Sequence, residues 1–252
     1  MTSKSIHAMR PLSAGVSTPL SSETTAPNFD RVARIYRWLE YLTFGPLLWR
    51  CRTHFLPQLL QCRNALILGD GDGRFTARLL HLNSQIRVHA VDGSPRMIET
   101  LEQAATPHRN RLTTQIANMN HWNPPHSEPY DLIVTHFFLD CLTTAEVAAL
   151  ASRLRPVLAP QPHWLVSEFA VPQTFFGRLF AAPLVALLYR AFRVITGLRQ
   201  QSLPEHARAL TDSGWALDRE SLHLRGLLVS QLWRLETPGH ASSPLQSSSM
   251  NR

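Results

Sequence analysis

An apolar run followed by three glycines constrains the fold of this chain more than any other feature. Residues 65–68 read Ala-Leu-Ile-Leu, and Gly69, Gly71 and Gly73 follow at every second position. A short apolar run of this kind is typical of a buried parallel strand. Glycines at its end let the backbone turn sharply and approach a ligand, because they carry no Cβ that would clash. The pattern therefore predicts a strand that ends in a ligand-binding turn.

An acidic residue follows at the end of the next predicted strand. Asp92 comes nineteen residues after Gly73 and directly follows the stretch 87–91. A carboxylate at this place can accept hydrogen bonds from the two hydroxyls of a ribose. Together, the glycine turn and the acid predict a nucleoside-containing cofactor. The alternative for Asp92 is a local role as a cap of the helix that follows at Ser94.

The glycine spacing distinguishes between classes of cofactor. A dinucleotide-binding turn reads Gly-x-Gly-x-x-Gly, and its third glycine would fall at Arg74, which disfavours a nicotinamide-dependent oxidoreductase. The pattern Gly-x-Gly-x-Gly, closing at Gly73, resembles the first motif of class I S-adenosylmethionine-dependent methyltransferases. The run Leu-Gly-Asp-Gly-Asp-Gly also resembles the glycine motif of spermidine synthases. An aminopropyltransferase that uses decarboxylated S-adenosylmethionine is therefore an open alternative.

Strand-like and helix-like stretches alternate along the chain and predict an α/β fold. We expect strands at 65–68, 87–91, 112–116, 131–135, 164–168, 215–224 and 227–234. We expect helices at 29–42, 47–60, 74–82, 94–105 and 143–158, with a further capping box at Ser202 and Glu205. This order resembles the Rossmann-like methyltransferase sheet. The resemblance implies seven strands, mostly parallel, with helices on both faces and an antiparallel edge hairpin.

Composition divides the chain into a domain and two tails. Residues 1–27 and 237–252 are rich in small and polar residues and are expected to be disordered. Residues 28–236 form the expected methyltransferase domain, with an N-terminal helical segment at 28–62 and an apolar, lid-like helix insertion at 173–197. The stretch from Phe175 to Val194 is interrupted by Arg178, Pro183 and Arg190, which leave too short an uncharged run to span a bilayer. It is expected to act as a lid, to contact a membrane peripherally, or to pack on the domain.

Charge and cysteine content limit the partners. The formal net charge is +7, but charged residues make up only 17% of the chain and form no basic block with interleaved aromatics. We therefore expect no nucleic-acid partner. The three cysteines are odd in number and form no Cys-x-x-Cys motif, and no metal-ligand spacing is present. We expect a cytoplasmic protein without a metal, in peripheral contact with the inner face of a membrane if the apolar stretch binds lipid.

The class I resemblance implies a set of cofactor contacts. The glycine turn would approach the methionyl part, Asp92 the ribose, and the residues after the next strands the adenosine. The positions implied or bordering this site are Gly69, Asp70, Gly71, Gly73, Asp92, Ser94, Met97, Asn118, Met119 and Thr135.

One histidine follows the central predicted strand, where open α/β sheets bind ligands. His136 has an ordinary pKa near 6.5 and is our candidate general base. The alternative is a strand-end histidine that bonds only to backbone. Glu168 ends the later strand and is expected to face the same pocket.

The N-terminal region carries a second, narrower resemblance. Phe29, Val32, Ala33 and Tyr36, followed by Phe44-Gly45 and Trp49-Arg50, are similar to the N-terminal segment of the ubiquinone/menaquinone-biosynthesis C-methyltransferases. This resemblance implies a helical segment over the cofactor and a small, apolar or lipophilic acceptor. A further alternative is a non-catalytic Rossmann-like domain that binds a partner through residues 175–194.

Overall fold

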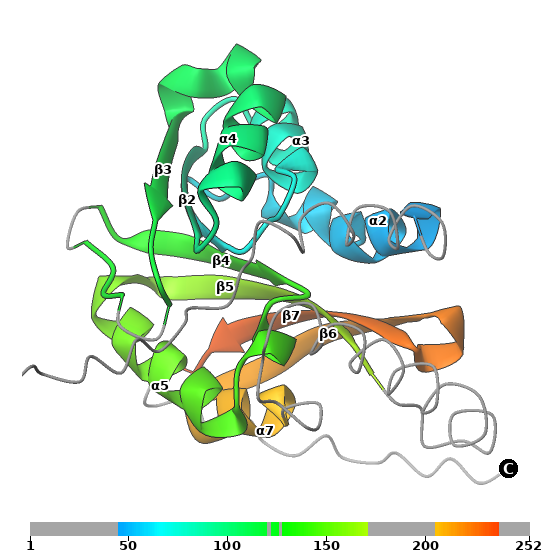
Figure 1. Cartoon of the computed structure of the whole chain (residues 1–252). Coiled ribbons are helices and arrows are strands. Elements are labelled where there is room, and N and C mark those ends of the chain that lie inside the picture. The colour runs from blue at the N-terminus through cyan, green and yellow to red at the C-terminus, as the bar shows by residue number, and fades with distance from the viewer. Residues whose placement is uncertain (1–44, 120–121, 126–127, 171–204, 237–252) are drawn as a thin grey trace, which may run out of the picture.

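A single seven-stranded sheet organises the structure, which is a computed structural model describing residues 45–119, 122–125, 128–170 and 205–236. The strands lie in the order β3-β2-β1-β4-β5-β7-β6 (Figure 1). They are β1 (Asn64–Leu68), β2 (Arg87–Asp92), β3 (Leu112–Ile116), β4 (Tyr130–His136), β5 (Leu158–Phe169), β6 (Trp215–His223) and β7 (Leu228–Leu235). Pairing is parallel from β3 through β5, and β7 runs antiparallel to both β5 and β6. The expected mostly parallel sheet with an antiparallel edge hairpin is confirmed.

Helices cover both faces of this sheet. The helices are α2 (Gly45–Thr53), α3 (Arg74–Leu82), α4 (Pro95–Ala104), α5 (Thr144–Leu154) and α7 (His206–Asp212). On one face, α3 and α4 pack on apolar side chains of β1, β2 and β4, and α2 packs beside β7. On the other face, α5 and α7 enclose a core that contains the fully buried Trp164 of β5 (Figure 1). The carboxyl ends of β1, β2, β4 and β5 meet at one edge because these strands are parallel.

Local capping explains where two of the helices begin. Ser94 precedes α4 and accepts a hydrogen bond from the N–H of Met97 at 3.3 Å, with Pro95 at the first helical position. Thr143 and Glu146 form the expected capping box at the start of α5. Both helix starts lie at the carboxyl edge of the sheet, where strands β2 and β4 end.

Two helices end earlier than the sequence predicted, each shortly before a proline. The helix expected at 47–60 ends at Thr53, and a 3-10 helix at Leu56–Leu59 contains Pro57. The helix expected at 143–158 ends at Leu154, shortly before Pro156. Proline lacks an N–H donor and disfavours helical geometry in the residue before it. Strand β5 is longer than expected, and its first part pairs only with β4, since the ladder to β7 begins at His163.

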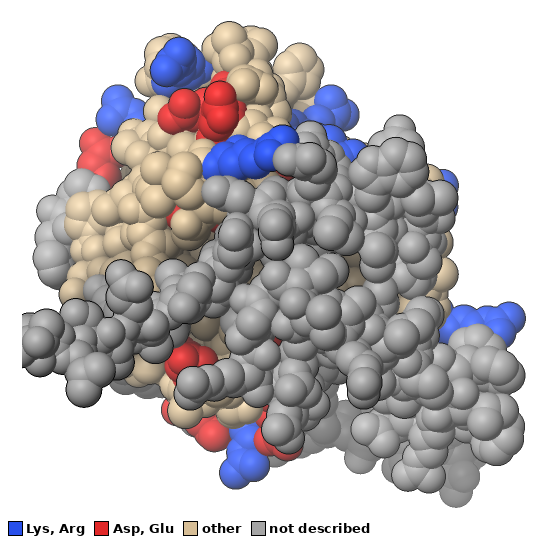
Figure 2. Space-filling view, viewed as in Figure 1, with Lys and Arg blue, Asp and Glu red and all other residues tan. Residues whose placement is uncertain are grey.

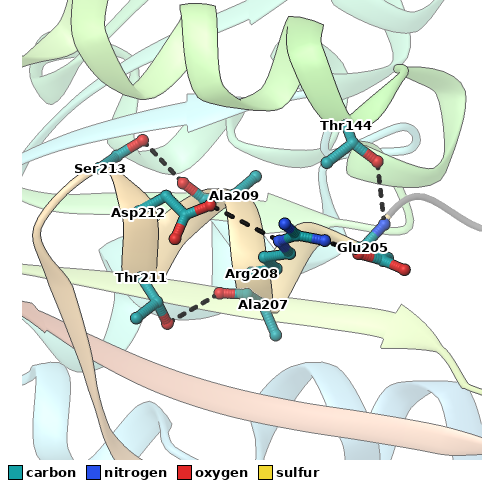
Figure 3. A network of polar contacts seen from close by, with 8 residues as sticks. All are labelled: Thr144, Glu205, Ala207, Arg208, Ala209, Thr211, Asp212 and Ser213. Carbon is teal, nitrogen blue, oxygen red and sulfur yellow. Dashed lines mark hydrogen bonds and ion pairs between the residues drawn. The ribbon is translucent and has the colours of Figure 1, made fainter.

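One hydrogen bond joins the start of α7 to the start of α5, and further polar contacts lie within α7 (Figure 3). The Oγ1 of Thr144 accepts the N–H of Glu205 at 3.2 Å. Arg208 forms ion pairs with Glu205 at 3.3 Å and with Asp212 at 3.7 Å. Helix α7 begins at His206 without a side-chain cap, and the expected capping residue Ser202 lies outside the described residues.

Several sequence predictions concern residues that the structure does not describe. These are the tails 1–27 and 237–252, most of the N-terminal helical segment 28–62 (up to residue 44), and the insertion 173–197 with its stretch 175–194. Within the described ranges, no helix has the length and apolar character needed to cross a membrane. On the face shown in Figure 2, the charged side chains of the described residues are scattered among uncharged ones.

Candidate active site

The glycine turn joins β1 to α3 with three residues in the left-handed region. The φ angles of Gly69, Gly71 and Gly73 are 68°, 67° and 73°, a conformation that costs other residues free energy. A Cβ at Gly69 would lie 2.6 Å from Cδ2 of Phe138, and one at Gly73 would lie 2.5 Å from Cα of Leu101. A Cβ at Gly71 would meet no atom within 4 Å. The turn is thus packed at its two ends and open in the middle, which fits a ligand that lies against its backbone.

Asp70 points inward from this turn and caps α3. Its Oδ2 accepts the N–H of Thr76 at 3.0 Å and the Oγ1 of the same residue at 2.6 Å. The side chain is almost fully buried, and burial raises the pKa of Asp70 to about 6. Asp70 therefore has a structural role, and its role toward a cofactor stays a prediction.

Asp92 lies next to the glycine turn, at the end of β2. The glycine turn is linked to the end of β2, because Gly69 donates its N–H to the carbonyl of Val91 at 3.0 Å. The Oδ1 of Asp92 accepts the N–H of Ser94 at 2.8 Å, so the local contact expected as the alternative is present. The side chain is half-buried, and burial raises the pKa of Asp92 to about 6. Its partly exposed carboxyl is oriented by the backbone at the same edge as Gly71.

The residues expected around the adenosine divide into two groups. Asn118 is exposed and follows Ala117, whose N–H donates to the carbonyl of Asp92 at 3.0 Å. Met97 is half-buried in the first turn of α4. Ser94, in contrast, is buried as the cap of α4, and Met119 is buried in the core beneath α5. The structure thus brings Asn118 to the edge that carries Asp92, and it places Met119 in the core.

The end of β4 carries two buried side chains that face opposite sides of the sheet. Thr135 accepts a hydrogen bond from Nε1 of Trp164 at 3.0 Å. His136 packs edge-on against Phe75 of α3, with ring centroids 4.4 Å apart, and neither ring nitrogen has a hydrogen-bond partner among the residues that the structure describes. Burial, with the charge of Arg52 nearby, lowers the pKa of His136 well below its ordinary value. His136 is therefore buried and favours the neutral imidazole, and its role as a base stays a prediction.

A turn after β4 closes the other side of the glycine turn. It contains Phe137, with a φ of 52°, followed by Phe138 and the 3-10 helix Leu139–Cys141. Glu168 at the end of β5 is buried and accepts two N–H groups of this turn. The carboxyl of Glu168 binds the backbone of the turn after β4, and its place facing a cofactor pocket stays a prediction.

Sequence reasoning missed two residues that the structure places at this edge. Arg52 of α2 is 5% exposed, and its guanidinium lies 5.3 Å from the ring centroid of Phe137. Phe138 fills the space beside Gly69. An arginine late in a helix normally indicates a solvated face, and a phenylalanine normally indicates core, so neither gave a signal. Among the described residues, no group of three or more His, Cys, Asp or Glu side chains is arranged to hold a metal ion.

A separate groove lies on the outer side of α3 and contains none of the predicted site residues. Its volume is about 510 Å³, and its lining comes from α2, α3, α4 and the segment after α4. The lining residues are Trp49, Arg74, Ala77, Arg78, His81, Ala104, Pro107 and His108.

Comparison with known proteins agrees with this geometry. Residues 65–161, which run from β1 into β5 and include the glycine turn and Asp92, match a family described as "Methyltransferase domain". This stretch of the chain is therefore similar to methyltransferase domains. The match supports the predicted enzyme class and S-adenosylmethionine as the cofactor. The resemblance of the N-terminal segment to quinone-biosynthesis enzymes has no support in these comparisons, and no curated protein matches the chain in sequence.

Solved methyltransferase structures share the fold. Mitomycin 7-O-methyltransferase MmcR superposes with a TM-score of 0.63 at 17% identity, over 85% of this chain and 62% of its own. An O-methyltransferase family 2 protein from Planctomyces limnophilus, in complex with apigenin, gives 0.58 at 19% identity, over 81% of this chain and 61% of its own. N-methyltransferase NodS from Bradyrhizobium japonicum gives 0.52 at 16% identity, over 75% of this chain and 97% of its own.

These identities show the fold alone. This chain also spans only about three fifths of the length of MmcR and of the Planctomyces protein. The acceptor of this protein is therefore a matter for proposal.

Proposed function

We propose that this protein transfers a methyl group from S-adenosylmethionine to an oxygen or nitrogen atom of a small, apolar or aromatic acceptor. The observation that carries the proposal is the glycine turn, open at Gly71 and flanked by Asp92, within a matched methyltransferase domain. The solved proteins with this fold support a small-molecule acceptor, because their names specify O- or N-methylation and one was solved with apigenin.

The residues of the site have distinct tasks in such a reaction. Asp92 would accept hydrogen bonds from the ribose hydroxyls, and the open side of Gly71 would let the methionyl part lie against the backbone. Asn118 would accept from the adenine amino group through its amide oxygen. These contacts fix the cofactor at the carboxyl edge of β1 and β2, next to the turn after β4.

Alignment is the main contribution that the chain can make to the rate. When bound, S-adenosylmethionine would supply an electrophilic methyl carbon, whose bond to sulfur would break as a lone pair of the acceptor forms the new bond. The protein orients the acceptor in line with that bond and excludes water. A hydroxyl or ammonium acceptor must also lose a proton. His136 would take it as a neutral imidazole if the acceptor reaches one of its buried ring nitrogens.

We place the reaction in a reducing compartment such as the cytoplasm. The three cysteines all lie in the described part of the chain and are unpaired there.

A methyl-transfer screen tests the proposal. Purified protein would be incubated with S-adenosylmethionine carrying a labelled methyl group and a panel of small phenols, amines and hydroxylated polycyclic compounds. Transfer of label to an acceptor, accompanied by S-adenosylhomocysteine and abolished in Asp92→Ala, is the expected result. Turnover of decarboxylated S-adenosylmethionine with an amine acceptor would instead establish an aminopropyltransferase. Binding of a protein partner without cofactor binding would establish the non-catalytic alternative.

A further inference from the structure

We propose that Glu168 is a positioning residue of the cofactor pocket. Its carboxyl group holds the turn after β4 against the glycine turn after β1, and it does so without touching the cofactor. This inference rests on the proposed function, because it assigns Glu168 a role in binding S-adenosylmethionine.

Glu168 supplies a cap that the turn itself lacks. One carboxyl oxygen, Oε1, accepts the N–H of Phe138 at 3.1 Å and the N–H of Leu139 at 2.8 Å. Both donors lie at the start of the 3-10 helix Leu139–Cys141, whose N-cap residue provides no side-chain hydrogen bond. The first N–H groups of a helix have no partner within the helix and need an external acceptor when buried. Glu168 provides that acceptor from the neighbouring strand β5, and its side chain is 1% exposed.

The backbone just before these donors is strained. Phe137 has a φ of 52°, in the left-handed region that aromatic residues seldom adopt. Such a conformation persists only where the surrounding contacts determine it. The N–H of Phe137 donates to the carbonyl of Ser167 at 2.7 Å, and Glu168 fixes the next two residues. Strand β5 therefore accepts hydrogen bonds from three successive N–H groups of the turn after β4, those of residues 137–139.

The turn that Glu168 holds forms one wall of the glycine turn. A Cβ built on Gly69 would lie 2.6 Å from Cδ2 and 3.1 Å from Cγ of Phe138. The aromatic ring therefore packs directly on the backbone of Gly69. A shift of the Phe138 backbone would move this ring and release the first residue of the turn, next to the open side of Gly71.

The role needs an oxygen acceptor and not a negative charge. Burial, with the nearby charge of Asp140, raises the pKa of Glu168 well above its ordinary value. The observed contacts use Oε1, so a proton on the other oxygen leaves both hydrogen bonds intact. An amide at the same position retains an acceptor oxygen, and Glu168→Gln therefore separates this role from that of a charged ligand for the cofactor.

The chain offers a matched control at the opposite edge of the sheet. Asp131 near the start of β4 accepts the N–H groups of Arg63 and Asn64 at 2.7 and 2.9 Å. The chemistry is the same, since a carboxylate on one strand binds two backbone N–H groups next to another strand. Asp131 lies at the amino end of β4, whereas the glycine turn lies at the carboxyl end of β1. Asp131→Ala therefore tests the loss of a carboxylate that binds two backbone N–H groups far from the site.

Calorimetric titration with S-adenosylhomocysteine tests the inference on the full chain, with thermal unfolding measured beside it. Glu168→Ala is expected to weaken binding at least about tenfold, and Glu168→Gln to stay within about threefold of the wild type. Asp131→Ala is expected to unfold at a lower temperature and to bind as the wild type does. If Glu168→Ala does not fold, Glu168→Asp carries the same expectation, because its oxygen is one methylene too short to reach both donors.

Three results would overturn the inference while leaving the proposed function intact. They are wild-type affinity in a folded Glu168→Ala or Glu168→Asp protein, an equal loss in Glu168→Gln, and an equal loss in Asp131→Ala. A wild-type protein that does not bind S-adenosylhomocysteine would refute the proposed function itself, and this inference with it.

Discussion

Adding one methyl group at Gly71 and at Gly73 separates the binding role of the glycine turn from its packing role. Both residues have φ near 70°, so an alanine at either position carries a similar backbone cost of about 1–2 kcal/mol. The surroundings of the new Cβ differ. At Gly71 it meets nothing within 4 Å, whereas at Gly73 it lies 2.5 Å from Cα and 2.7 Å from Cγ of Leu101.

These distances set the expected magnitudes. Gly71→Ala is expected to lower the free energy of unfolding by about 1–2 kcal/mol, the backbone cost alone. Gly73→Ala adds an overpacking cost of about 1–3 kcal/mol, because the backbone of α4 cannot move aside as a flexible side chain would. The order reverses for binding. The methyl group of Gly71→Ala occupies the open side of the turn and is expected to weaken S-adenosylhomocysteine binding at least about tenfold, or about 1.4 kcal/mol.

Denaturant unfolding and calorimetric titration of both variants measure the two effects. The reasoning requires that Gly73→Ala be the less stable variant and that Gly71→Ala be the folded variant with impaired binding. Wild-type affinity in Gly71→Ala would refute the assignment of the open side to the cofactor. Equal stability of the two variants would refute the packing geometry at Leu101.

Three further predictions concern buried titratable groups. The pKa of Asp92 in the protein without ligand is about 6. Affinity for S-adenosylhomocysteine is therefore expected to rise as the pH increases from 5 to 7 and the carboxyl group ionises. A pH-dependent affinity that persists in Asp92→Asn would contradict this role. The pKa of Asp70 is raised from 3.8 to about 6, so the folded state binds the proton more tightly and loses up to about 3 kcal/mol of stability as the pH rises through that window. Asp70→Asn is therefore expected to be more stable than the wild type in urea unfolding at pH 7 and to lose this advantage below pH 4. Burial lowers the pKa of His136, so the folded state loses stability relative to the unfolded state as the pH falls below 6.5, the ordinary pKa of histidine. His136→Phe, which can pack against Phe75, is expected to unfold at a lower pH than the wild type. An unchanged pH midpoint of acid unfolding would argue against a buried neutral imidazole.

Local sequence patterns were sufficient to predict the sheet and the position of the glycine turn. Apolar runs such as 65–68 carry their own strand signal, and the glycines with Asp92 mark the carboxyl edge directly. The helix ends were less predictable, because Pro57 and Pro156 interrupt stretches whose apolar pattern continues through them. The length of β5 also escaped prediction, since its start at Leu158 pairs with Tyr130 of β4 ahead of a register shift that the composition does not reveal.

The contacts that complete the site depend on register and could not be inferred from spacing. Phe138 packs on Gly69 across an interval of 69 residues, and Glu168 binds the N–H of Phe138 across 30. His136 illustrates the same limit. Its place after a central strand suggested a base, but the face of β4 on which it lies puts its ring against Phe75 in the interior.

Calorimetric titration of the wild-type protein and of Asp92→Ala with S-adenosylmethionine and S-adenosylhomocysteine tests the central claim most directly. NADH and decarboxylated S-adenosylmethionine are titrated beside them as the ligands of the alternative enzyme classes. The account predicts saturable binding of the first two ligands at one site, weakened in a folded Asp92→Ala protein. Preference for decarboxylated S-adenosylmethionine would contradict methyl transfer in favour of aminopropyl transfer. Absence of nucleoside binding by the folded wild type would contradict the site itself.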